Sequence, residues 1–254
     1  MTEPSVTPAT VTLPPLAAPV DELWHLLLDM NEAVSAPWTL IGGQMVLLHA
    51  LEHGVVPPQI SQDGDVIADV RADPAAIHAI VGWLDNAGFS LDGVSPQMLA
   101  HRYVCSSATS ERPIVVDVLA PDGVGDRTDL STTPPGRTVQ VPGGSQALHR
   151  TKLVTVTHED RTGRIPRPSL LAAIVSKAAA LDLPGDPARH HRDLALLLCL
   201  LPDPFEAREQ TGSKDRHRLR AATALLDEDH IAWTLAPTGR REAGHAALRI
   251  LLDP

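Results

Sequence analysis

The stretch from Trp38 to Val70, WTLIGGQMVLLHALEHGVVPPQISQDGDVIADV, constrains the fold more than any other part of the chain. It opens with a short apolar run at 38–41 and passes through a glycine pair into apolar residues at helical spacing. It ends in a second apolar run that begins at Asp63. Strand, helix and strand in this order predict an α/β core, with the glycine pair where the first strand leads into the helix.

Two aspartates, Asp63 and Asp65, flank one glycine at the start of the second apolar run. Alternate residues of a strand share a face, so these carboxylates are expected on one side, about 7 Å apart along the chain. Carboxylate oxygens in this arrangement suit a hard divalent cation such as Mg²⁺. A third carboxylate is expected from a neighbouring strand, and Asp117 is the candidate because it is a lone charge in the apolar run 114–119. A structural hydrogen-bonding role is the alternative for Asp117.

The glycine pair Gly42-Gly43 removes two side chains where a strand leads into a helix. Backbone N–H groups at the positive end of a helix form a ready binding site for phosphate. A Gly-Gly turn is common by itself, but its position ahead of an Asp-x-Asp strand predicts that a triphosphate approaches the chain here.

Apolar periodicity predicts the remaining elements. Asp21 is expected to cap the first helix. The predicted helices cover 21–34, 43–54, 73–88, 169–183, 187–201, 215–227 and 241–251. The predicted strands cover 38–41, 63–70, 102–106, 113–119, 138–141 and 153–157, with a long polar loop at 120–136.

Strands mixed with helices, followed by helices alone, predict a mixed sheet flanked by helices and then an all-helical C-terminal domain. The expected divisions are a disordered tail at 1–20, an α/β domain at 21–164 and a helical domain at 165–254, with a cleft between the two domains.

The acidic composition restricts the possible partners. A formal net charge of −10, from 21 basic and 31 acidic residues, excludes nucleic-acid binding over the whole surface. Two arginine-rich stretches, 150–167 and 208–220, could supply a local patch, and ordinary solvated faces are the alternative. With two cysteines, no signal peptide and no apolar run long enough for a membrane span, a cytoplasmic protein is expected.

The order of the glycine pair, a helix, Ser61-x-Asp63-x-Asp65 and Asp117 in an apolar strand resembles the DNA polymerase β nucleotidyltransferase superfamily. The helical half is similar to the AbiEii-type (MenT-like) nucleotidyltransferase toxins, which carry a lysine and then an Arg…Lys/Arg-Asp-Leu motif on successive helices. The matching residues here are Lys177, Arg189, Arg192, Asp193 and Leu194. The resemblance spans roughly residues 38 to 201 and implies that the α/β part is a nucleotidyltransferase core.

The resemblance also implies roles for individual residues. Three carboxylates would hold the metal and serve catalysis: Asp63, Asp65 and Asp117. Lys177 would contact the nucleotide phosphate, Asp193 would complete the site, and Arg189 would pair with Asp193 or with phosphate. The residues implied to bind the nucleotide are Gly42, Gly43, Ser61, Lys177 and Arg189. Snorkelling at the surface is the alternative for Lys177, a lone charge in an apolar helix.

Three positions depart from the family pattern. Gln59 stands where an arginine usually precedes the Asp-x-Asp motif, and Gly64 replaces the apolar residue between its two aspartates. Leu196 occupies the place of a second aspartate after the Arg-Asp-Leu motif. These departures concern the substrate and the rate more than the fold.

The implied activity is transfer of a nucleoside monophosphate from an NTP to an acceptor, with two Mg²⁺ ions during catalysis and Asp117 or a nearby water as base. The implied acceptor is the end of a tRNA, with growth inhibition as the result and an antitoxin protein as partner. Two alternatives remain: a small, aminoglycoside-like acceptor, and an inactive binding module that keeps the fold.

The sequence His49-Ala-Leu-Glu52-His53 matches the H-x-x-E-H pattern of inverted zinc peptidases. Both histidines would lie one turn apart on a helix, as a zinc site requires. No third ligand can be nominated from the sequence, so the favoured interpretation places both histidines on the polar flank of the helix.

Overall fold

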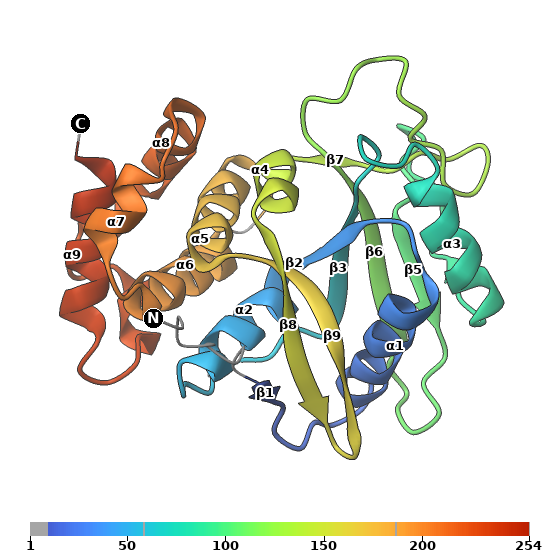
Figure 1. Ribbon diagram of the computed structural model, residues 1–254, viewed down its shortest axis with the longest axis horizontal. Coiled ribbons are helices and arrows are strands. Elements are labelled where there is room, and N and C mark those ends of the chain that lie inside the picture. Colours follow the sequence, from blue (N-terminus) through green and yellow to red (C-terminus); the bar gives the residue numbers. More distant parts are fainter. Residues whose placement is uncertain (1–9, 58, 186, 254) are drawn as a thin grey trace, which may run out of the picture.

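The computed structural model describes residues 10–57, 59–185 and 187–253. A mixed sheet flanked by helices is followed by a helical part, which confirms the predicted fold class (Figure 1). Across these described ranges, no helix combines the length and the apolar character needed to cross a membrane.

The larger sheet contains the Asp-x-Asp strand as an interior strand. Its order is β2-β3-β6-β5-β4, and β7 pairs with β6. Its strands are β2 (Trp38–Ile41), β3 (Asp63–Ala68), β4 (Ser90–Leu91), β5 (Arg102–Cys105), β6 (Ile114–Pro121) and β7 (Gln140–Val141). Strands β3 and β6 are parallel, whereas β2 and β5 pair antiparallel to them. The apolar runs of β3 and β6 therefore lie side by side in the middle of the sheet.

A smaller sheet has the order β1-β8-β9 and joins β1 (Thr10–Thr12), β8 (Thr151–His158) and β9 (Arg161–Pro168). Strand β1 corrects the prediction of a disordered tail for residues 10–12, which pair with β8; residues 1–9 of that tail lie outside the described residues. Strand β9 was also not predicted, because its sequence RTGRIPRP carries two prolines and a glycine. As an edge strand it tolerates prolines that a central strand would not.

Helix α1 (Val20–Ala33) contacts strands of both sheets, and α3 (Ala76–Asn86) packs on β3 and β6. The apolar stripe of α1 is buried, including Leu23, Leu27 and Met30. The predicted cap is wrong: Pro19 precedes the helix without a side-chain cap, and the Asp21 carboxylate faces His158 instead.

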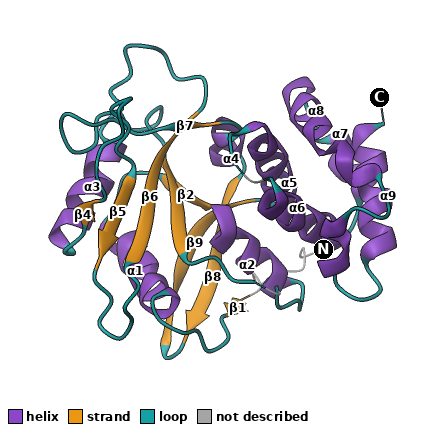
Figure 2. Ribbon diagram, turned by 180° about the vertical axis from the view of Figure 1, so that it is seen from behind, coloured by secondary structure: helices purple, strands orange, loops and turns teal. Residues whose placement is uncertain are grey.

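The helical part gathers on one side of the sheets (Figure 2). It contains α5 (Leu170–Ala179), α6 (Ala188–Leu200), α7 (Pro204–Glu209), α8 (Ser213–Leu219) and α9 (Arg241–Leu252), after the short α4 (Gly144–His149). The helix predicted at 215–227 is shorter in the structure, because a 3-10 helix, Arg220–Leu226, follows α8.

Helix α2 (Gly42–Glu52) contributes to two hydrophobic cores. Leu47 and Leu48 pack in the core of the sheets, whereas Met45 and Val46 pack among the helices of the C-terminal part. The predicted boundary between residues 164 and 165 falls inside β9, and the division into two domains stays a prediction.

Candidate active site

Three carboxylates meet where β3 and β6 lie side by side. The parallel register places Asp65 directly opposite Asp117, and Asp63 lies two residues earlier on the same face of β3. One oxygen from each of the three side chains lies within 4.8 Å of the others. The structure thus brings together the two predicted strand aspartates and the predicted third carboxylate.

The glycine pair makes room for this acidic cluster. Gly42 has a φ of 68°, in the left-handed region, and a Cβ at this position would overlap the Asp65 carboxylate. A Cβ on Gly43 would overlap the side chain of Ser61. The missing side chains are therefore needed for the acidic site itself, while the contact of Gly42 and Gly43 with phosphate stays a prediction.

Gly64, the residue between the two aspartates, packs closely against helix α1. A Cβ there would lie 3.0 Å from Leu23 Cδ1 of α1, so the glycine lets the helix approach β3 closely. A larger residue at this position would require the Leu23 side chain to shift.

The pKa values of Asp63 and Asp65 are shifted in opposite directions. Burial, together with the neighbouring charges of Asp63 and Asp117, raises the pKa of Asp65 to about 7. Burial also acts to raise the pKa of Asp63, but the hydrogen bond from Ser61 and the positive charge of Arg189 outweigh it and lower that pKa below its usual range. Without a bound cation, the cluster thus holds more negative charge than its surroundings favour.

Two arginines partly compensate this charge. Arg102 of β5 donates two hydrogen bonds to Asp117, from Nε to Oδ1 at 2.9 Å and from Nη2 to Oδ2 at 2.7 Å. Its Nη2 also lies 4.0 Å from Asp63 Oδ2. Arg189 of α6 donates to Ser61 Oγ, and its Nη2 lies 3.4 Å from Asp63 Oδ1. Arg189 thus pairs with Asp63 and Ser61 in the structure, and not with Asp193 as one predicted alternative had it.

Lys177 of α5 is buried, with 4% of its surface exposed, and its Nζ lies 2.7 Å from Asp193 Oδ2 of α6. This position excludes the alternative in which Lys177 snorkels at the surface. The pair joins two successive helices beside the acidic cluster. Contact of Lys177 with a nucleotide phosphate stays a prediction.

Two cavities adjoin the acidic cluster, and both are lined by Asp63 and Arg189. One has a volume of about 420 Å³ and combines polar groups with an apolar wall. Its polar lining includes Ser61, Asp63, Arg102, Arg189, Arg192 and Asp193. The other measures about 280 Å³ and is lined by all three aspartates and Lys177. Two compartments that share one acidic cluster can hold two reactants on either side of a transferred group.

The histidines of the H-x-x-E-H pattern lie elsewhere and have other partners. His49 is buried, and its Nε2 lies 3.1 Å from the carbonyl oxygen of Pro168, so the predicted position on the polar flank of the helix is wrong for His49. Glu52 pairs with Arg167, and His53 Nδ1 lies 2.9 Å from the carbonyl oxygen of His49. Burial, followed by the positive charge of Arg167, lowers the pKa of His49 well below its usual value.

Arg102 is the site residue that sequence reasoning missed. It begins β5 and reaches Asp117 because the antiparallel register places the two residues opposite each other. A basic residue at the start of a predicted strand was the only local signal.

No family model matches the chain. No curated protein matches it either. Among solved structures, the solution structure of the antibiotic-resistance factor ANT(2'')-Ia is similar at 14% sequence identity and a TM-score of 0.36, over 92% of this chain and 93% of that chain. The side chains of the site, rather than this likeness, therefore carry the functional proposal, and membership of the AbiEii-type family stays a prediction.

Proposed function

We propose that the chain is a metal-dependent nucleotidyltransferase that moves a nucleoside monophosphate from an NTP to an acceptor hydroxyl. The observation that carries the proposal is the meeting of Asp63, Asp65 and Asp117 from two adjacent parallel strands, between two cavities. Phosphoryl and nucleotidyl transfer need positioning and charge neutralisation more than covalent chemistry, and this arrangement supplies both.

The acidic cluster fits a hard divalent cation. Its donors are carboxylate oxygens only, which favours Mg²⁺ over metals that prefer nitrogen or sulfur ligands. The raised pKa of Asp65 indicates an excess of negative charge that a cation would relieve. Asp63, Asp65 and Asp117 would hold Mg²⁺, with two ions present during catalysis. Bound Mg²⁺ would neutralise the negative charge that builds on the phosphoryl group.

The basic residues have complementary tasks in this proposal. Arg189 lines both cavities and lies against Ser61 and Asp63, so a triphosphate entering either cavity meets its guanidinium. Lys177, held by Asp193, supplies a buried positive charge to the cavity that all three aspartates line. Arg102 donates one hydrogen bond to each oxygen of Asp117, and the second lone pair of each oxygen can bind a metal ion or accept a proton from the acceptor.

The acceptor is proposed to be a small, cationic polyhydroxyl compound of the aminoglycoside type. Several arginines of the basic stretches expected to bind RNA are engaged with carboxylates: Arg150 and Arg218 pair with Asp215, Arg161 pairs with Asp29, and Arg167 pairs with Glu52. A chain with a net charge of −10, in which these arginines are paired, attracts a cationic acceptor more than a polyanion.

The end of a tRNA is the second candidate acceptor, with an antitoxin protein as partner. It is favoured by the arrangement of Lys177, Arg189 and Asp193 on successive helices, which resembles the toxin family. Arg192 also lines the larger cavity, where it offers a guanidinium to a phosphate chain.

The test incubates the full chain with each α-³²P-labelled NTP and Mg²⁺, in separate reactions with an aminoglycoside mixture and with total tRNA. Labelled aminoglycoside supports the first acceptor, and labelled tRNA supports the second. Asp65→Asn should abolish transfer, whereas Asp85→Asn, the same change on the exposed face of α3, should not. NTP binding without transfer to either acceptor would favour an inactive binding module, and NTP binding unaffected by Asp65→Asn would overturn the proposal.

A further inference from the structure

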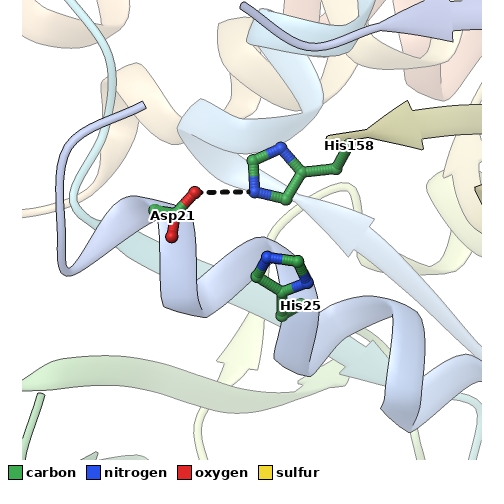
Figure 3. A group of neighbouring side chains, drawn as sticks. All are labelled: Asp21, His25 and His158. Atoms are coloured by element: carbon green, nitrogen blue, oxygen red, sulfur yellow. Dashed lines mark ion pairs between the residues drawn. The ribbon is translucent and has the colours of Figure 1, made fainter. Parts of the chain in front are cut away.

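A second cluster of possible metal ligands lies outside the acidic site. It consists of Asp21 and His25 from α1 and His158 from the end of β8 (Figure 3). Asp21 and His25 are four residues apart on one helix and so share a face, and His158 approaches that face from the strand. The cluster therefore joins two elements that are distant in the sequence.

His158 is an unusual residue for its position. It follows Val154 and Val156 on the core-facing side of β8, and 1% of its surface is exposed. Its Nε2 lies 2.9 Å from Asp21 Oδ1, yet neither ring nitrogen has a hydrogen-bond partner among the described residues, because the carboxylate lies off the N–H direction. A buried polar ring without hydrogen bonds is costly, so its presence in the core calls for another partner.

The geometry of the cluster suits a single transition-metal ion. One ligand atom from each of the three residues lies within 4.8 Å of the others. The rings of His25 and His158 are 4.7 Å apart between centroids and tilted by 50°. Ligand atoms around tetrahedral zinc, at bond lengths near 2.0–2.2 Å, are about 3.3 Å from one another. Asp21 and His158 are already close to that spacing, and a ligand atom of the partly exposed His25 lies within 4.8 Å of both.

The surrounding backbone holds the two elements in place. Gly163 of β9 lets α1 approach closely, since a Cβ there would lie 2.9 Å from Leu28 Cδ2. On the other side of β8, the amide of Leu13 donates to the carbonyl oxygen of Thr157 at 2.9 Å. The turn after His158 places Glu159 Oε2 3.4 Å from His25 Nε2, so a fourth oxygen donor is within reach.

We propose that Asp21, His25 and His158 bind one Zn²⁺, with Glu159 or a water as the fourth ligand. Two imidazole nitrogens with carboxylate oxygens favour zinc over Mg²⁺, which distinguishes this site from the three-aspartate cluster. The ion ties α1 to the β8–β9 hairpin and completes the partners of His158. Its role is structural.

The test uses the full chain without a histidine tag, stripped with EDTA and titrated with Zn²⁺ alone in a calorimeter. Because the buried His158 is a poor site for a first variant, the ligands to remove are the partly exposed ones, in His25→Ala and Asp21→Asn. Control variants are His78→Ala, which removes an exposed histidine outside the cluster, and Asp63→Asn, which removes a carboxylate of the acidic site. Circular dichroism confirms that each variant folds.

One equivalent of tightly bound Zn²⁺ and a higher Tm are expected for the wild type and for both controls. Affinity should fall by about 100-fold or more in His25→Ala and in Asp21→Asn. Tetrahedral Co²⁺, substituted for Zn²⁺, should give its strong visible absorption only in chains that keep the cluster. Absence of stoichiometric binding, or binding that survives His25→Ala and Asp21→Asn, would overturn the proposal and leave an ordinary buried His–Asp contact.

Discussion

At the scale of single residues, Asp65 is the least favourable charge in the proposed site. It shares one face of the sheet with Asp63 and Asp117, and its pKa of about 7 reflects burial and the repulsion from both. Asp65 costs stability, and yet the chain leaves space for its carboxylate by having glycine at position 42. This combination is typical of a functional position.

Replacing Asp65 by asparagine should stabilise the metal-free chain. The folded-state pKa lies above the unfolded value of 3.8, so the contribution of Asp65 is favourable below pH 4 and is lost as the pH rises toward 7. At pH 8 without metal, Asp65→Asn should raise the free energy of unfolding by on the order of 2 kcal/mol, and the gain should shrink at pH 5. Urea unfolding in EDTA measures it, with Asp85→Asn as control; a less stable Asp65→Asn at pH 8 would contradict this expectation.

A methyl group at residue 42 should disable the site. Gly42→Ala places Cβ in the space of the Asp65 carboxylate, so Mg²⁺ affinity, measured by calorimetry, and NMP transfer should both fall by at least about 100-fold. Gly54→Ala is the matched control, since Gly54 has a φ of 71° but no atom within 4 Å of the point that a Cβ would occupy. It should cost about 1 kcal/mol of strain and keep activity. Equal losses in both variants would assign the effect to backbone strain.

At the scale of elements, α5 and α6 carry one buried ion pair to the edge of the acidic cluster. Lys177 donates a hydrogen bond to Asp193. Single and double substitutions of this pair can therefore separate its effect on stability from its effect on activity. Removing one partner leaves a buried charge, whereas removing both does not.

Asp193→Leu should destabilise the chain by about 3 kcal/mol, because the ammonium of Lys177 loses its partner in a buried position. The double variant Lys177→Met/Asp193→Leu should recover most of that stability. Neither should transfer a nucleotide, because both lose the arrangement that presents Lys177 to the cavity. Thermal unfolding and the labelled-NTP assay measure the two properties. Activity in the double variant would remove Lys177 from the proposed mechanism.

Strands with continuous apolar runs, such as β2, β3 and β6, could be predicted from sequence because burial on both faces leaves that signature. Strands β1 and β9 could not. Each depends on pairing with β8. Strand β1 lies far from β8 in the sequence, and β9 pairs with β8 in a hairpin although its own sequence is rich in arginine and proline. Local propensity carries no information about such a partner.

The acidic cluster could be predicted for a similar reason. Alternation on one strand places Asp63 and Asp65 together, and a lone charge in an apolar strand identifies Asp117. The contacts of Arg102 and Arg189 could not be predicted, because they depend on the register of β5 and on how α6 packs against the sheet. Side chains that reach a site across elements are fixed by tertiary packing.

At the scale of the whole molecule, α2 belongs to two cores at once. Its Leu47 and Leu48 face the sheets, its Met45 and Val46 face the C-terminal helices, and its first residues border the acidic cluster. In a chain truncated after β9, Met45 and Val46 would be exposed to solvent. The sheet half is therefore a poor candidate for a stand-alone fragment. If a helical half from another protein were fused to it, the α2 residues that pack against the C-terminal helices would have to be redesigned to fit the new partner.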